Sequence, residues 1–446
     1  MNTALAQAVV QSLSFSADTR ENAARSLSRF SERDWERVLG WMDNSGLALY
    51  FLHRIEETEN SSVLPERVWA RLQRNKTDNQ ERVMRMVEEF GRINRQFDQA
   101  GFNYAVVKGF SLVPAFCPDI NLRAQSDLDY MVDEASLAAA QRILLELGYV
   151  MVQATGAQFV FRSAERLALL SDSPYAFTTK PMVELHLSMW ETPNTQIAFT
   201  EPGWSLDIKR TSEYGGMKFP VLSAEDSFLL QIIHVFQHIL CCWIRVSWLL
   251  ELGYFLTRQA ADIALWEKID QRFQPIGNLT EFAAVVIGLV TRTFAAPFPA
   301  GISHWNSQLR STSRLWVDNY GPKWILSDHP YHESGLFPPT KLVLFLHEEY
   351  IGDPRIRKRV KSERIFPWKR PPRIAELSNA VSPAQAAHVE WGFRMQRIYH
   401  HLGAGLRYAW EVPRWRKLKK QTSLFDSQVG KPATEPLPKR FPYSSV

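Results

Sequence analysis

Cysteine is scarce in this chain of 446 residues, which contains only Cys117, Cys241 and Cys242. Their spacing matches no zinc-binding pattern, and adjacent cysteines such as Cys241 and Cys242 rarely form a disulfide because the geometry is strained. Reduced thiols and a cytoplasmic location are therefore expected. The first residues also lack the basic head and apolar core of a secretion signal.

Long apolar runs and the common nucleotide-binding motifs are missing as well. The apolar stretch at residues 282–290 stops at Arg292. No window reaches the roughly 20 uncharged apolar residues that a membrane-spanning helix needs, so we expect no transmembrane segment. The sequence has no Gly-x-x-x-x-Gly-Lys and no Gly-x-Gly-x-x-Gly, which removes the main support for P-loop and Rossmann folds.

Overall charge is nearly balanced, with 52 basic and 47 acidic residues and a net charge of +5. The basic excess collects late, in two runs within residues 355–370 and 414–420, which also contain Trp368 and Trp415. Basic residues beside aromatic ones favour contact with a polyanion, either nucleic acid or an anionic membrane surface. The alternative is a solvated helix face followed by an unstructured tail over the last 25 residues.

The most informative stretch begins with the apolar residues 104–107, which predict a strand. Lys108 and Gly109 then break the run, and Gly109 lets the backbone approach a ligand closely. Ser111 is placed to begin a helix over residues 111–116, whose free N–H groups favour phosphate. The pattern therefore predicts a strand, a tight turn and an anion-binding helix start.

Two aspartates follow on a second predicted strand. Asp127 and Asp129 are two residues apart, so on a strand both side chains point to the same face. Their mutual repulsion is relieved most simply by a divalent cation, and carboxylate oxygens suit Mg²⁺. Residues 181–187 alternate apolar and polar side chains, which predicts a third strand carrying Glu184 and His186. If it lies beside the aspartates, Glu184 joins them at one edge of the sheet.

Together, the Lys-Gly turn, the run Arg123-x-x-Ser126-Asp127-x-Asp129 and the strand at 183–186 resemble the nucleotidyltransferase superfold shared with DNA polymerase beta. More narrowly, the chain resembles a bacterial group of uncharacterised nucleotidyltransferases with the same Lys-Gly variant. The resemblance covers roughly residues 30–260. The wider superfamily has Gly-Ser at the turn, whereas here Phe110 follows Gly109.

The resemblance implies an α+β fold in which a mixed-sheet domain is flanked by helical regions. It also implies an enzyme that moves a nucleoside monophosphate from a nucleoside triphosphate such as ATP to a hydroxyl, using two Mg²⁺ ions. Asp127, Asp129 and Glu184 would bind the ions and carry catalysis. The nucleotide contacts would be Lys108, Gly109, Ser111, Arg123 and Ser126. The acceptor stays open among RNA, protein, sugar and small molecule.

Further side chains are candidates for substrate contact. His234 and His238 lie four residues apart on a predicted helix, hence on one face. Such a pair can bind zinc, but the glutamate of a His-Glu-x-x-His motif is missing, so packing or substrate contact is favoured. Arg245 is expected either to pair with Glu251 or to line the cleft, and His186 is also a candidate contact.

Length and composition shifts predict several parts. These are a helical N-terminal region, a catalytic domain, a helical C-terminal domain and a basic extension with a partly disordered tail, at residues 1–100, 101–215, 216–350 and 351–446. An alternative function is a catalytically silent module that binds nucleotide or a partner within a biosynthetic or toxin–antitoxin-like system. The complete acidic trio argues against that alternative.

Overall fold

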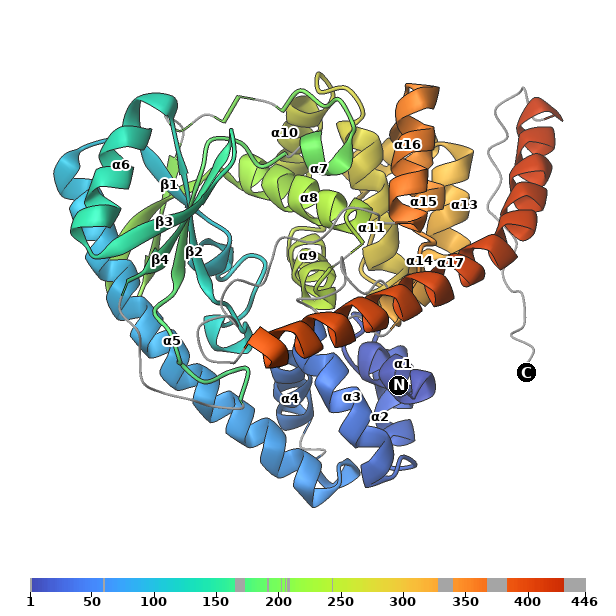
Figure 1. Ribbon diagram of the computed structural model, residues 1–446, viewed down its shortest axis with the longest axis horizontal. Helices are drawn as coiled ribbons and strands as arrows, with labels where there is room; N and C mark the ends of the chain where they lie inside the picture. Colours follow the sequence, from blue (N-terminus) through green and yellow to red (C-terminus); the bar gives the residue numbers. More distant parts are fainter. Residues whose placement is uncertain are drawn as a thin grey trace.

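A seven-stranded mixed sheet lies between two sets of helices (Figure 1). The computed structural model of the chain describes residues 2–58, 61–164, 173–190, 192–201, 203, 204, 206, 209–242, 244–327, 340–366 and 383–428. Within these residues the architecture confirms the predicted α+β class. None of their helices is long and apolar enough to cross a bilayer.

The N-terminal region is helical, as predicted. Its helices are α1 (Thr3–Ser12), α2 (Ala17–Leu27), α3 (Glu32–Ser45), α4 (Ala48–Glu57) and α5 (Glu66–Ala100). Ser31 and Asp34 form a capping box that starts α3. Pro65 precedes the first residue of α5, where its missing N–H costs nothing. A short 3-10 turn, η1 (Ser61–Val63), connects α4 to α5.

The sheet has the strand order β3-β4-β5-β2-β1-β7-β6. Its strands are β1 (Tyr104–Val107), β2 (Asp127–Val132), β3 (Tyr149–Ala154), β4 (Gln158–Ser163), β5 (Met182–His186), β6 (Lys209–Tyr214) and β7 (Met217–Leu222). Strand β2 pairs antiparallel with β1 and parallel with β5. The prediction that the strand of Glu184 lies beside the strand of Asp127 and Asp129 is therefore confirmed.

One face of the sheet packs on α5 and on α6 (Glu134–Glu146). Leu128 and Tyr130 point into this core, where the ring of Phe90 stacks on Phe110 at 4.6 Å. Phe110 is the residue that departs from the Gly-Ser pattern of the wider superfamily. Because its ring is buried beneath α5, this position serves the core and not the ligand.

A long helical array packs on the other face of the sheet, beginning with α8 (Ala224–Leu240), which Ser223 caps as its serine predicts. Beyond it lie α9 (Val246–Arg258), α10 (Ile263–Phe273), α11 (Leu279–Phe294), η4 (Ala300–Ile302), α12 (Ser303–Gln308), α13 (Ser311–Asn319), α14 (Gly321–Ile325), α15 (Leu344–Tyr350), α16 (Pro354–Ile365) and α17 (Pro383–Gln428). Figure 1 shows α17 running along the outside of this array.

Several local expectations are wrong. The polar composition of residues 191–222 predicts irregular structure, but they contain α7 (Thr192–Thr195) and the β6–β7 hairpin, which turns at Gly215 and Gly216 with positive φ. Strand β6 is an edge strand with polar residues on both faces, so it shows no alternation. Because β7 pairs with β1, the sheet extends past residue 215 to Leu222.

The predicted helix at residues 111–116 is also wrong. The chain instead forms the short 3-10 helix η2 (Gly109–Leu112), and Pro114 has no N–H with which to continue it. The tail expected to be unstructured from residue 422 remains helical to Gln428. Three parts of the chain lie outside the described residues: residues 429–446, Trp368, and residues 166–170, for which the sequence predicts a short strand.

Candidate active site

The turn after β1 has an unusual backbone. Lys108 and Gly109 both have positive φ, at 55° and 45°. A Cβ added to Gly109 would lie 2.9 Å from Oε1 of Gln125, so both conformation and space favour glycine. Ser111 Oγ donates to the Lys108 carbonyl at 2.7 Å and closes the turn. The structure therefore places Ser111 behind the turn, where its hydroxyl stabilises the backbone of Lys108.

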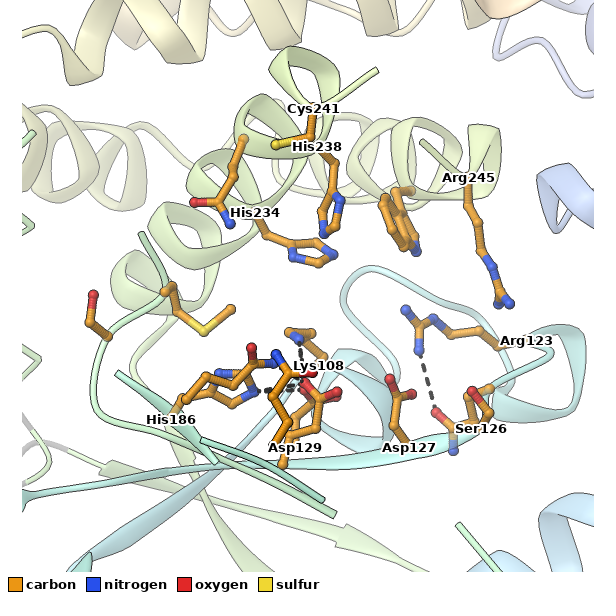
Figure 2. Close-up of a pocket in the computed structure, with 18 residues that line it drawn as sticks. Lys108, Arg123, Ser126, Asp127, Asp129, His186, His234, His238, Cys241 and Arg245 are labelled. Carbon is orange, nitrogen blue, oxygen red and sulfur yellow. Dashed lines mark hydrogen bonds and ion pairs between the residues drawn. The ribbon is translucent and has the colours of Figure 1, made fainter. Parts of the chain in front are cut away.

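The three predicted carboxylates come from two adjacent strands. Asp129 on β2 lies directly opposite Glu184 on β5, and Asp127 lies two residues earlier on β2. All three line one pocket with a volume of about 320 Å³ (Figure 2). Ser126 also lines this pocket. The parallel register of β2 and β5 thus brings together residues that are more than fifty positions apart in the sequence.

Lys108 reaches into the middle of this group. Its Nζ lies 2.6 Å from Asp129 Oδ1 and 4.0 Å from Glu184 Oε2. Burial alone would lower the pKa of Lys108, but Asp129, Glu184 and Asp127 outweigh burial and raise it. Lys108 is therefore a permanent cation among the carboxylates.

His186 contacts the same two carboxylates from the end of β5. Its Nε2 lies 2.9 Å from Asp129 Oδ1 and 3.3 Å from Glu184 Oε2. Burial and Lys108 oppose protonation, but the hydrogen bonds to Asp129 and Glu184 raise the pKa of His186. Ligand atoms of Asp129, Glu184 and His186 lie within 4.8 Å of one another, so this cluster could hold a metal ion.

The remaining aspartate and one glutamine complete this wall. Burial, and then the nearby Asp129 carboxylate, raise the pKa of Asp127. Gln158 Nε2 on β4 donates to Glu184 Oε2 at 2.8 Å. Burial opposes ionisation of Glu184, but its hydrogen bond from His186 and the charge of Lys108 lower its pKa. Sequence reasoning missed Gln158, because only the strand order shows that β4 lies beside β5.

The opposite wall is aromatic and comes from α8 and α9 (Figure 2). The rings of His234 and His238 lie 4.4 Å apart, and Trp248 lies 4.6 Å from His234 and 4.9 Å from His238. Burial and Lys108 lower the pKa of His238 to about 3, and burial also lowers that of His234. Both imidazoles are therefore neutral near pH 7. Trp248 was not among the sequence candidates.

Two arginines lie at one end of the pocket (Figure 2). Arg123 Nε donates to Glu251 Oε1 at 2.9 Å, and the hydroxyl of Tyr50 donates to the same oxygen at 3.0 Å. Arg245 donates to the carbonyl of Ala124. Of the two expectations for Arg245, the structure supports lining the cleft, since Glu251 pairs with Arg123.

A Lys-Gly turn, two aspartates on one strand and a glutamate on its parallel neighbour form the arrangement expected of a nucleotidyltransferase. A family described as uncharacterised nucleotidyltransferase matches residues 31–295, which is more than half of the chain. The chain therefore belongs to this family. Comparison with curated proteins gives no match. The matched region begins where the resemblance was expected to begin and extends beyond residue 260 to the end of α11.

Proposed function

We propose that this protein moves a nucleoside monophosphate from a nucleoside triphosphate to a hydroxyl acceptor. The acceptor oxygen forms a bond to the α-phosphorus, the bond to the bridging oxygen breaks, and pyrophosphate leaves with that electron pair. The observation that carries the proposal is the meeting of Asp127, Asp129 and Glu184 in one pocket. Family membership supports nucleotidyl transfer in general terms.

The donor set suits Mg²⁺, because three carboxylates from adjacent strands supply the oxygen ligands that this ion prefers. In this proposal Asp127 and Asp129 would hold both ions, and Glu184 would hold one of them. Bound Mg²⁺ would supply Lewis-acid activation of the hydroxyl and of the phosphate. The raised pKa of His186 favours a hydrogen-bond donor that orients Asp129 and Glu184.

The other side chains of the pocket would bind and orient the nucleotide. Lys108 and Arg123 are cations throughout the physiological range and would contact the triphosphate, as would Arg245. The proton of the acceptor hydroxyl would pass to Glu184, whose lowered pKa keeps it ionised. The rings of His234, His238 and Trp248 form an uncharged surface against which a nucleobase or a group of the acceptor would pack.

The experiment measures pyrophosphate release from labelled triphosphates, ATP first, in the presence of Mg²⁺ and a whole-cell extract. Asp127→Asn and Asp129→Asn are each expected to reduce release at least about a hundredfold while the fold is retained. Asp119→Asn is the matched control, because Asp119 is exposed and caps the short turn η3 (Ile120–Leu122) outside the pocket. The fraction of the extract that gains label identifies the acceptor.

Two results would contradict the proposal. Full activity of Asp127→Asn would remove the carboxylates from the mechanism. Calorimetric binding of Mg²⁺-nucleotide without pyrophosphate release under any acceptor condition would instead support the silent binding module.

A further inference from the structure

The long helix α17 carries a continuous apolar stripe on its outer surface. Seven large apolar side chains are exposed there, from 44% for Met395 to 85% for Trp410. Apart from the adjacent Ile398 and Tyr399, they recur every three or four residues, which places them on one face of the helix. The stripe consists of Trp391, Met395, Ile398, Tyr399, Leu402, Leu406 and Trp410. At 1.5 Å per residue it is about 30 Å long.

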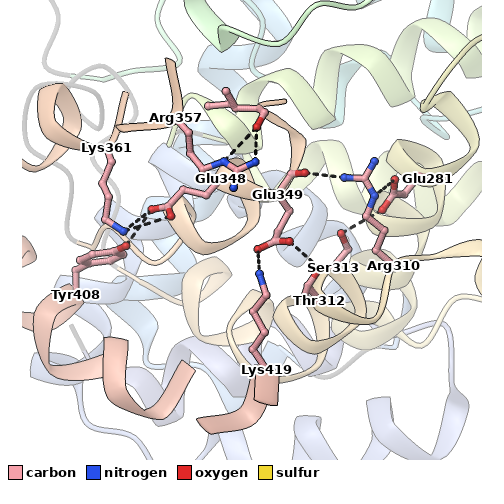
Figure 3. Close-up of polar contacts among 11 residues, drawn as sticks. Glu281, Arg310, Thr312, Ser313, Glu348, Glu349, Arg357, Lys361, Tyr408 and Lys419 are labelled. Carbon is pink, nitrogen blue, oxygen red and sulfur yellow. Dashed lines mark hydrogen bonds and ion pairs between the residues drawn. The ribbon is translucent and has the colours of Figure 1, made fainter. Parts of the chain in front are cut away.

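The other face of α17 is fixed to the helical array (Figure 3). The Tyr408 hydroxyl donates to Glu348 at 3.1 Å, and Lys419 donates to Glu349. Trp415 stacks on Phe345 with ring centroids 4.9 Å apart. These contacts, together with the buried Ala404, set the rotation of the helix. The stripe therefore faces solvent because the opposite face is anchored.

The charged residues of this segment are predominantly basic. Between residues 391 and 422 the sequence has a single acidic residue, Glu411, which accepts a hydrogen bond from Tyr320. The same segment has eight basic residues, namely Arg394, Arg397, Arg407, Arg414, Arg416, Lys417, Lys419 and Lys420. Five of them lie between residues 414 and 420, directly after the apolar stripe. One of these five, Lys419, is held by Glu349. A partner for this surface has to be both apolar and anionic.

We propose that α17 docks on an anionic lipid bilayer, with its stripe lying in the plane of the membrane surface. An amphipathic helix with aromatic and aliphatic residues on one face and Lys and Arg beside it has the composition of an interfacial helix. Trp391, Tyr399 and Trp410 are the residue types that favour the headgroup level. Attachment is peripheral, since no helix among the described residues is suited to span the bilayer.

Two other occupants fit the observations less well. RNA would pair with the basic residues but would not remove the exposed aliphatic side chains Ile398, Leu402 and Leu406 from water. A second copy of the chain would cover the stripe but would bring two strongly basic segments together, which costs electrostatic energy.

The test is cosedimentation of the full chain with vesicles of phosphatidylglycerol and phosphatidylcholine, compared with phosphatidylcholine alone. The double variant Leu406→Gln, Trp410→Gln should partition about tenfold less strongly onto the anionic vesicles. Met84→Gln is the matched control, because Met84 is 61% exposed on a different helix, α5. Circular dichroism verifies that both variants fold.

The proposal is supported if the intact chain and Met84→Gln bind anionic vesicles equally and the double variant partitions about tenfold less strongly. Absence of binding by the intact chain overturns it, as does equal binding to phosphatidylcholine alone. It is also overturned if a single-stranded RNA competes for the same residues while vesicles do not bind. A dimer that the double variant converts to a monomer would assign the stripe to a second copy.

Discussion

Lys108 Nζ lies 2.6 Å from Asp129 Oδ1, where the Asp129 side chain is buried and that of Lys108 is 12% exposed. The lysine thus occupies the centre of a carboxylate cluster that is suited to a divalent cation. Its charge offsets repulsion that would otherwise destabilise the folded protein when no metal is bound. The turn that places Lys108 there has a backbone conformation that L-residues adopt rarely, a kind of strain that collects at functional sites.

Replacing this lysine should make the fold depend on metal. In Lys108→Met the carboxylates lose their internal cation, and we expect the free energy of unfolding to fall by about 3 kcal/mol. Millimolar Mg²⁺ should raise the melting temperature of Lys108→Met more than that of the parent chain. Differential scanning fluorimetry measures both values. Lys76→Met, which removes a partly exposed pair with Glu56, should show no such Mg²⁺ response; identical responses in all three proteins would contradict the idea.

The Arg123–Glu251 ion pair should be costly to break. Glu251→Gln keeps an acceptor for the Tyr50 hydroxyl but leaves the buried charge of Arg123 without a counter-charge. We therefore expect the free energy of unfolding to fall by about 3–5 kcal/mol. Urea unfolding provides the measurement. Glu81→Gln breaks a solvent-exposed pair with Arg85 and should change stability by about 0.5 kcal/mol or less. Equal losses for the two variants would show that burial of the pair is unimportant.

Gly109 should tolerate alanine less well than Gly101 does. Both have positive φ, at 45° and 67°, so each substitution carries a backbone penalty of about 1 kcal/mol. Only at Gly109 does the added Cβ meet a neighbour, Gln125 Oε1 at 2.9 Å, and this crowding should cost about 1 kcal/mol more. Chemical denaturation of Gly109→Ala and Gly101→Ala tests the difference. If Gly101→Ala proves equally or more harmful, the close approach of Gln125 is not what selects glycine.

Stability should rise with pH through the titration of Lys341. This side chain is buried and donates to the carbonyls of Arg364 and Ile365, and burial lowers its pKa from 10.5 to about 8. Between these values the unfolded chain holds the extra proton, so the free energy of unfolding increases with pH, by up to about 3 kcal/mol. The stability that neutral Lys341 contributes is complete above pH 10.5 and is lost as the pH falls to about 8.

The measurement compares the parent chain with Lys341→Met at pH 7.5 and pH 10 by urea unfolding. The stability difference between the two proteins should move in favour of the parent chain as pH rises. Lys323→Met, at an exposed lysine on α14, controls for the loss of one amino group. A difference that stays constant with pH would mean that Lys341 titrates alike in the folded and unfolded chains.

The strands that carry the site could be predicted from the sequence because polar and apolar residues alternate along them, although Asp129 itself is buried. Asp127 and Asp129 flank the buried Leu128, and Glu184 lies between Val183 and Leu185, which are both buried. Such patterns fix which face a side chain occupies, and the parallel pairing of the two strands then agrees with the family resemblance.

Other parts of the site depend on contacts between distant segments. The partners Arg123 and Glu251 are 128 residues apart in the sequence, and the position of Gln158 depends on which strand lies beside β5. No local pattern records such pairings. Strand β6 was missed for a different reason, since an edge strand exposes both faces and shows no period. The bacterial origin, the cytoplasmic location and the identity of the nucleotide stay predictions.

Helix α5 belongs to both hydrophobic cores of the protein. Val68 and Leu72 near its start pack with α3 and α4 in the core that the N-terminal helices share with the helical array, whereas Phe90 and Phe97 near its end pack beneath the sheet. Between them the buried Asn79 donates to the carbonyls of Asn121 and Arg123, beside the pocket. Neither core can melt without releasing half of this helix, so heating should destroy the sheet and the helical array in one calorimetric peak.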